Sequence, residues 1–290
     1  MDYCLYQDQL VPREQLKIDP EDRGYHFGDG IYEVVHVYHG KAFALSDHLT
    51  RFKESAEKLD LPMLYSTDKL GELVQQLIEK NKLEHGMVYF QMTRGISPRN
   101  HLYTRNETPV LTGFSKPLPD EKRESVRLYL TDDIRWLRCD IKTINLLGNV
   151  LAKREATDHQ CDEALLHRDG TVTEGSSSNV FLIKNETLYT HPATNLILNG
   201  ITRQITIRLA KAKGYTVVEE PFPKEVIKDA DEAFITSTIH EITPVTEVIG
   251  DETAHFPVGP VTKMLQQAFA EEIAKHSQTA MKELSQKSIF

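Results

Sequence analysis

One lysine, Lys142, lies in a segment whose other residues are largely apolar or small, Ile141-Lys142-Thr143-Ile144. Apolar neighbours take water away from an amine, which disfavours its charged form. A neutral amine is the nucleophile that Schiff-base chemistry with a carbonyl compound requires. The same pattern is also typical of a lysine on the wet side of an alternating strand. The local sequence leaves both interpretations open.

The segment Leu198-Asn199-Gly200-Ile201-Thr202 is typical of the start of a helix. Backbone N–H groups and the positive end of the helix dipole face outward at such a start, which suits a phosphate group. The alternative is an ordinary helix N-terminus that Asn199 or Thr202 caps.

Small hydroxyl residues gather in two further segments. Residues 171–179 place one carboxylate, Glu174, among threonines and serines, and could line a polar pocket or form a plain loop. Thr236-Ser237-Thr238 ends an apolar stretch and could present hydroxyls to an anion or only cap a strand.

A proline-bearing loop, Ser97-Pro98-Arg99-Asn100-His101, follows an expected strand. Arg99 and His101 could together bind a carboxylate, because a guanidinium offers a planar fork of donors. Solvated loop charges are the alternative interpretation.

Composition and missing motifs exclude several functions. The 290 residues contain 34 Lys and Arg against 43 Asp and Glu, a net charge of −9, which argues against a nucleic-acid partner. The three cysteines have neither metal-ligand nor disulfide spacing, and no metal site is expected. No signal peptide and no membrane-spanning stretch is recognisable, so we expect a cytoplasmic protein without a membrane partner. Dinucleotide, Walker, Gly-x-Ser-x-Gly and His-Glu-x-x-His motifs are absent from the sequence.

Strands and helices alternate along the chain, with frequent hairpins. Apolar periodicity predicts a helix that Ser46 caps, a second over Leu70–Ile78, a third near Leu146–His159, one after Gly200 and a long one from Pro260. Strands are expected over residues 3–6, 9–11, 31–38, 42–45, 87–94, 110–115, 126–131, 163–167, 179–184, 187–190, 216–219, 233–236 and 245–249. This pattern predicts a mixed α/β (α+β) fold rather than a doubly wound parallel sheet.

Two domains are expected from the length and from one proline-rich segment. Residues 1–116 would form a small N-terminal α/β domain, 117–122 a linker, and 123–290 a larger C-terminal domain that carries Lys142.

Several long motifs, in this order, resemble the fold-type IV family of pyridoxal 5'-phosphate (PLP) enzymes, and within it most of all the bacterial D-amino-acid aminotransferases. They are Asp22-Arg23-Gly24-Tyr25-His26-Phe27-Gly28-Asp29-Gly30-Ile31-Tyr32-Glu33, Thr93–His101, Ile134–Lys142, Thr173–Asn179, Gly200–Arg203 and Thr236–Thr238. The resemblance runs from near residue 3 to about 270. Residues after about Lys275 form an extension whose role the sequence does not give.

The resemblance implies a role for each candidate. Lys142 would form the aldimine with PLP and move the substrate proton. Glu174 would face the pyridine nitrogen, where a carboxylate favours the protonated ring. Cofactor contacts are further implied for Arg51, Ile201, Thr202 and Thr238 at the phosphate, and for Ser177 and Leu198 at the ring.

Substrate choice would rest on Tyr32, Arg99 and His101, which correspond to the family's trap for the substrate carboxylate. Arg99 and His101 would come from the partner subunit of a homodimer, with PLP between the two domains. The implied reaction is ping-pong transfer of an amino group from a D-amino acid, D-alanine first, to a 2-oxo acid such as 2-oxoglutarate.

Three alternatives remain. A branched-chain L-amino-acid aminotransferase and an aminodeoxychorismate lyase share the fold, although the branched-chain enzymes do not usually carry the Pro-Arg-x-His loop. A PLP-binding protein without turnover is the third, and the intact set of Lys142, Glu174, Arg51 and Thr238 argues against it.

Overall fold

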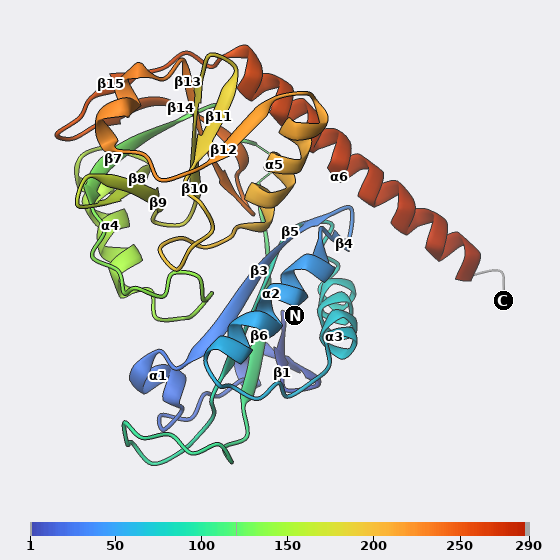
Figure 1. Ribbon diagram of the computed structural model, residues 1–290. Coiled ribbons are helices and arrows are strands. Elements are labelled where there is room, and N and C mark those ends of the chain that lie inside the picture. The colour runs from blue at the N-terminus through green and yellow to red at the C-terminus, as the bar shows by residue number, and fades with distance from the viewer. Residues whose placement is uncertain (1, 120, 288–290) are drawn as a thin grey trace. The chain divides into compact units, whose positions relative to one another are not determined.

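The computed structural model describes the backbone of residues 2–119 and 121–287, and the side chains as far as residue 276. By backbone contacts the chain divides into unit 1, which comprises Met1–Asp120, Ile141–Asn145 and Ile273–Phe290, and unit 2, which comprises Glu121–Asp140 and Leu146–Glu272. Each unit is built around its own β-sheet (Figure 1). The mixture of parallel and antiparallel strands confirms the predicted mixed α/β fold.

The sheet of unit 1 has six strands in the order β2-β1-β6-β5-β3-β4. Its elements are β1 (Tyr3–Tyr6), β2 (Gln9–Pro12), the 3-10 helix η1 (Arg13–Gln15), α1 (Arg23–Phe27), β3 (Gly30–Tyr38), β4 (Lys41–Ala42), α2 (Leu45–Lys58), α3 (Thr67–Lys80), β5 (His85–Thr93) and β6 (Val110–Pro117). All of its neighbouring strands run antiparallel.

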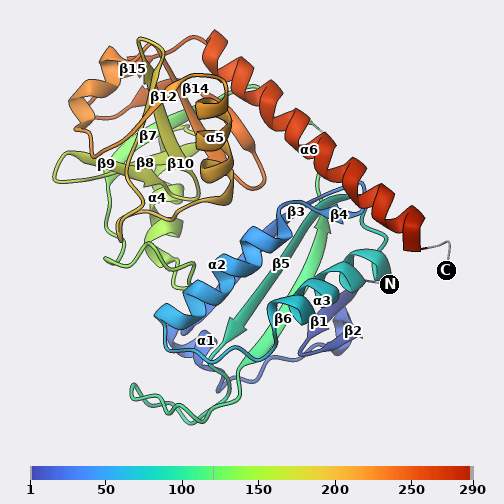
Figure 2. The same ribbon diagram turned by 45° about the vertical axis from the view of Figure 1, so that its right-hand side comes forward.

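Helices α2 and α3 cover one face of this sheet (Figure 2). Phe52 of α2 and Leu73 of α3 are fully buried against Val35 and Phe90 of the central strands. The opposite face is half-buried, and there the ring of Tyr32 stacks on that of Tyr89, with 5.5 Å between their centroids.

The sheet of unit 2 has nine strands, in the order β12-β11-β10-β13-β14-β7-β8-β9 with β15 beside β14. Its elements are β7 (Val126–Asp132), α4 (Leu147–Asp158), β8 (Glu163–Arg168), β9 (Thr171–Gly175), β10 (Asn179–Lys184), β11 (Thr187–Thr190), α5 (Ile201–Ala212), β12 (Thr216–Glu219), the 3-10 helix η2 (Lys224–Asp229), β13 (Glu232–Ser237), β14 (Glu241–Ile249) and β15 (Ala254–His255). The long helix α6 (Pro260–Lys287) begins where its proline predicted.

Helices pack on the sheet of unit 2 through small and apolar side chains. Ala152 and Ala156 of α4 contact Ala164 and Leu166 of β8. Helix α5 packs near β12 and β13. The first turn of α6 is fixed by the buried carboxylate of Glu232, which accepts hydrogen bonds from the backbone N–H groups of Val261 and Thr262 at 3.1 and 2.9 Å.

Local structure differs from expectation at three places. The strand expected over 42–45 is instead β4 (Lys41–Ala42) and ends at Ala42, since Ala44 has a left-handed φ of 51° that turns the chain into α2. Ala44 rather than Ser46 is the N-cap of α2. Residues 171–175 form the strand β9 rather than a loop. Residues 23–27 form the short helix α1, which local periodicity did not indicate.

The lysine segment also lies elsewhere than expected. Residues 141–145 group with unit 1 rather than with the second domain, because the backbone N–H of Tyr32 donates to the carbonyl of Lys142 at 2.9 Å and Ile144 N–H donates to Gly30. Residues 273–276 also group with unit 1, where His276 Nε2 lies 3.1 Å from the carbonyl oxygen of Ala42.

Candidate functional site

Lys142 is held at a fixed position beside strand β3. Its backbone N–H donates to Ser55 Oγ of α2 at 3.2 Å, and its carbonyl accepts from Tyr32. Its Nζ lies 4.3 Å from the centroid of the Tyr32 ring, and an aromatic face attracts a cation at that distance. Thr143, the next residue, forms a bridge with Ile31 of β3. The half-buried amine thus lies against Tyr32, for which the family resemblance implies substrate binding.

Arg51, predicted to bind phosphate, forms a buried ion pair with Glu33. Its Nε and Nη2 donate to the two oxygens of the Glu33 carboxylate, each at 2.8 Å, and His48 Nδ1 lies 2.7 Å from Glu33 Oε2. Burial raises the pKa of Glu33, but Arg51 and His48 outweigh burial and hold that pKa at about 2. Burial lowers the pKa of His48 below its ordinary value. The pairing fixes the direction in which α2 presents the guanidinium of Arg51.

The predicted carboxylate-binding residues Arg99 and His101 lie together in an exposed loop of unit 1. The His101 ring lies 5.3 Å from that of Phe27, and the Arg99 guanidinium lies 5.2 Å from the same ring. No hydrogen bond or ring contact in the described part of the chain joins either residue to Tyr32. The structure therefore brings two of the three predicted carboxylate ligands together.

In unit 2, Glu174 of β9 is a buried carboxylate with three donor groups around it. Arg135 Nη1 lies 2.6 Å from Oε1, Asn179 Nδ2 lies 2.9 Å from Oε2, and Leu198 N–H lies 3.2 and 3.1 Å from the two oxygens. Burial raises the pKa of Glu174 to about 7, although Arg135 favours the ionised form. We infer from the bidentate support of Arg135 by Asp133 that this guanidinium stays charged and directed at Glu174.

The predicted phosphate ligands Ile201 and Thr202 form the first turn of α5. Gly200 is the N-cap, and no side chain caps this helix, so neither Asn199 nor Thr202 fills the role that an ordinary N-terminus would give it. A Cβ at Gly200 would lie 2.3 Å from Oδ1 of Asn179. A side chain at position 200 would therefore push Asn179 aside, the residue that also contacts Glu174.

Ser177, Leu198 and Thr238 are the remaining predicted cofactor contacts. Ser177 Oγ donates to Glu163 at 2.7 Å, while the carbonyl of Leu198 accepts from Asn179 at 2.8 Å. Thr238 directly follows β13, at the strand end that its sequence position predicted. Asn179 thus contacts Glu174 and Leu198 and lies beside Gly200 at the start of α5, so four of the predicted residues, Glu174, Leu198, Ile201 and Thr202, lie around one part of unit 2.

Sequence reasoning missed three charged residues that hold these groups. Glu33 fixes Arg51, Arg135 contacts Glu174, and Glu163 accepts hydrogen bonds from the 176–177 loop. The available signal was a charge beside buried apolar residues, as for Glu33 between Ile31 and Val35 in β3 and Glu163 before Ala164 and Leu165 in β8. Burial of such charges requires partners, which the structure supplies from distant parts of the chain.

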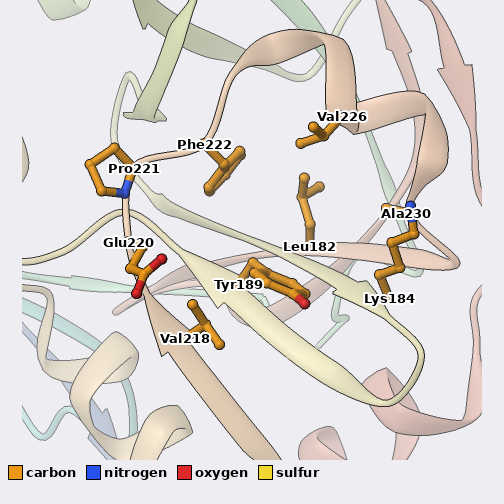
Figure 3. A pocket seen from close by; sticks show the side chains of 9 residues that line it. All are labelled: Leu182, Lys184, Tyr189, Val218, Glu220, Pro221, Phe222, Val226 and Ala230. Atoms are coloured by element: carbon orange, nitrogen blue, oxygen red, sulfur yellow. The ribbon is translucent and has the colours of Figure 1, made fainter.

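A cavity of about 250 Å³ lies elsewhere in unit 2 (Figure 3). Its walls come from β10, β11, β12 and the segment through η2, and they are mainly apolar; the residues are Leu182, Lys184, Tyr189, Val218, Glu220, Pro221, Phe222, Val226 and Ala230. None of the predicted site residues lines this cavity, so we do not assign the chemistry to it.

Comparison with known proteins gives a consistent result. The model of the family "Amino-transferase class IV" matches residues 30–248. The D-alanine aminotransferase of Listeria monocytogenes serotype 1/2a (strain 10403S) is 47% identical over 278 residues, which cover 93% of this chain and 96% of the relative.

Two solved structures share the fold at lower identity. The branched-chain amino acid aminotransferase of Escherichia coli has a TM-score of 0.85 and 28% identity, and covers 93% of this chain and 94% of its own. A putative 4-amino-4-deoxychorismate lyase from Legionella pneumophila has a TM-score of 0.81 and 29% identity, and covers 92% and 97%. Since the family model matches residues 30–248 and the Listeria relative is 47% identical over 93% of this chain, the chain belongs to the class IV aminotransferase family.

Proposed function

We propose that this protein is a PLP-dependent D-amino-acid aminotransferase that moves the amino group of D-alanine to a 2-oxo acid such as 2-oxoglutarate. The observation that carries the proposal is the placement of the Lys142 amine 4.3 Å from the Tyr32 ring centroid. The 47% identity to an enzyme named D-alanine aminotransferase supports the choice of substrate.

The side chains in both units fit the cofactor. The uncapped first turn of α5 offers backbone N–H groups and a positive dipole end to a phosphate. Buried Glu174 offers a carboxylate to a protonated ring nitrogen, and Lys142 offers a primary amine to a carbonyl carbon. When bound, PLP supplies a carbonyl carbon that accepts the amino group and a ring that withdraws electrons from the substrate carbon.

Lys142 would act as the acid and base at the substrate. Its Nζ would take the proton from the substrate Cα and return it during the transfer. The contacts of its backbone with Ser55 and Tyr32 keep the segment in place while the amine moves. Because the amine approaches from one side only, the fixed segment would also decide which enantiomer loses its proton.

Glu174 would hold a proton on the ring nitrogen. Its oxygens accept from Leu198 N–H and Asn179, which orients the carboxylate, and Arg135 favours its ionised form although burial raises its pKa to about 7. An ionised carboxylate at this position stabilises a positive charge on the ring by direct Coulomb attraction in a buried setting.

Arg99, His101 and Tyr32 would bind the substrate carboxylate, and the protein would work as a homodimer. Arginine suits a carboxylate because its planar donors match the two oxygens.

The homodimer is supported by large apolar side chains that stay exposed in unit 2, among them Ile134 at 65%, Leu137 at 61% and Leu147 at 68%. Large apolar side chains such as these would be covered if they lay in a contact with a second subunit. Sedimentation velocity should give twice the chain mass, and a monomer would exclude the proposal.

A lysine variant tests the assignment of Lys142. Lys142→Ala should retain PLP only non-covalently and lose at least about a thousandfold in kcat, since no other group replaces the acid and base. Borohydride reduction and peptide mapping should locate the cofactor on Lys142 in the parent protein. Lys53→Ala, an exposed lysine on α2, is the control and should keep full activity. Turnover that survives in Lys142→Ala would reject the assignment.

Substrate screening separates the proposed reaction from its relatives. An L-branched-chain enzyme would transfer amino groups from L-leucine and leave D-alanine untouched. A lyase would release pyruvate from aminodeoxychorismate with no amino acceptor present. We expect neither, and expect D-alanine-dependent glutamate formation only when 2-oxoglutarate is supplied.

A further inference from the structure

The two predicted carboxylate ligands share one aromatic support. Phe27, the last residue of α1, has the His101 ring 5.3 Å away and the Arg99 guanidinium 5.2 Å away. Both loop residues are exposed, and an exposed long side chain samples many rotamers unless a contact restricts it. The Phe27 ring is the contact that these two residues have in common.

Arg23, at the start of the same helix, holds both the ring and the loop backbone. It is 3% exposed, and its guanidinium lies 4.8 Å from the centroid of the Phe27 ring. Its Nη1 donates to the carbonyl of Asn100 at 2.6 Å, and its Nη2 donates to that of His101 at 3.4 Å. One planar group therefore reaches the loop next to Arg99 and at His101 itself.

An ion pair with Asp29 holds the guanidinium of Arg23 in place. Its Nε donates to Asp29 Oδ2 at 2.8 Å, and the same oxygen accepts from Arg94 Nε at 2.9 Å. Arg94 in turn donates to the carbonyls of Leu59 and Asp60, each at 2.8 Å. Through Arg23, Asp29 and Arg94 these contacts join the loop to the C-terminal end of α2, so the loop cannot shift without breaking a charged hydrogen bond.

We propose that Arg23, acting with Phe27, is a positioning residue that sets the Pro98–His101 loop for recognition of the substrate carboxylate. This inference rests on the proposed function, which assigns Arg99 and His101 to that carboxylate. Lysine at position 23 keeps the charge beside Asp29, but its single ammonium lacks the planar fork that reaches two carbonyls. Arg23→Lys therefore separates the positioning of the loop from the mere presence of a buried cation.

The test compares two substrates in the PLP-loaded, full-length protein. We expect Arg23→Lys to raise KM for D-alanine about tenfold or more with a smaller change in kcat, because misplacing a substrate-binding group costs this much. D-alaninol carries CH₂OH in place of the carboxylate, so its single-turnover rate should stay within twofold of the parent protein. The visible absorption of bound PLP should be unchanged. Arg105→Lys, an exposed arginine paired with Asp60, is the control and should leave KM unchanged.

Phe27→Leu is the second variant and carries the same prediction if Arg23→Lys does not fold. It removes the ring while keeping an apolar side chain. If Arg23 and Phe27 act together, the double variant Arg23→Lys/Phe27→Leu should raise KM for D-alanine little more than either single variant. An unchanged KM for D-alanine in both variants would overturn the inference, as would equal losses with D-alanine and D-alaninol. A parent protein that does not react with D-alanine would instead reject the proposed function, and an unchanged KM in Arg99→Lys would reject its assignment of Arg99.

Discussion

Replacing Glu33 by glutamine should destabilise the protein by about 3 kcal/mol at pH 7. The pKa of Glu33 falls from 4.5 to about 2 on folding, and each pKa unit corresponds to about 1.4 kcal/mol. The change leaves the buried cation of Arg51 without its carboxylate, and removing one partner of a buried ion pair costs about 3–5 kcal/mol in other proteins. Two independent arguments therefore give a similar loss.

The pH dependence of this loss has a defined direction. The folded-state pKa of Glu33 is depressed, so its stabilisation is fully present above pH 4.5 and is lost as the pH falls toward 2. The difference in unfolding free energy between the parent protein and Glu33→Gln should therefore shrink over that range.

Urea unfolding of the PLP-saturated protein, followed by far-UV circular dichroism, measures both effects. Glu54→Gln is the control, because Glu54 is an exposed acid on α2, the helix that carries Arg51, and its replacement should cost less than about 0.5 kcal/mol. A Glu33→Gln protein within 1 kcal/mol of the parent at pH 7 would refute the reasoning, as would a difference that does not change between pH 7 and pH 3.

Three further changes have expected outcomes. Gly200→Ala places a Cβ 2.3 Å from Asn179 Oδ1 and should weaken PLP binding about tenfold or more, measured by titrating PLP into the apoprotein; unchanged affinity would contradict the proposed role of this helix start. Burial raises the pKa of Glu174 to about 7, so this carboxyl gains a proton as the pH falls through 7 and kcat should decrease at acid pH. Glu174→Gln should lower kcat and remove this acid-side decrease. An unaltered pH profile of kcat in Glu174→Gln would exclude the proposed role of Glu174 at the ring nitrogen. Glu232→Ala removes the acceptor for Thr262 N–H at the start of α6 and should cost about 1–2 kcal/mol, seen as a lower Tm; an equal Tm would show that the cap is dispensable.

Amphipathic helices and regular strands were predictable from the sequence. Leu70, Leu73, Leu77 and Ile78 recur at helical spacing, and all four are buried in the core of unit 1. The hairpin of β10 and β11 was likewise indicated by its strand-forming residues and the turn between them. In these elements the local preference and the buried contacts agree, which is why periodicity alone identified them.

Elements that distant contacts stabilise were not predictable. Residues 171–175 are rich in threonine and glycine and were interpreted as a loop or a pocket lining, yet Thr173 is buried in β9 and donates to Asp133, 40 residues away. Helix α1 is only five residues long, and the N–H of Arg23 donates to the carbonyl of Gly95. Local patterns contain no information about partners at such separations.

In the candidate site too, some residues were predictable from local sequence and others were not. Lys142, Glu174 and the α5 start follow from short motifs that resemble the family, and the structure gives each a defined local environment. The residues that hold them, Arg135 and Glu33, carry no local signal beyond a charge among apolar neighbours. Their partners become visible only when the fold brings separate segments together.

The central claim is that the protein binds PLP through Lys142 and accepts D-amino acids, and one spectrum tests it most directly. The visible absorption of the purified, PLP-loaded protein would be recorded before and after adding D-alanine, and separately L-alanine. We expect a visible band that is lost with D-alanine and persists with L-alanine. A band that responds only to the L-enantiomer would contradict the D-amino-acid assignment, and no band after PLP is supplied would contradict the cofactor chemistry itself.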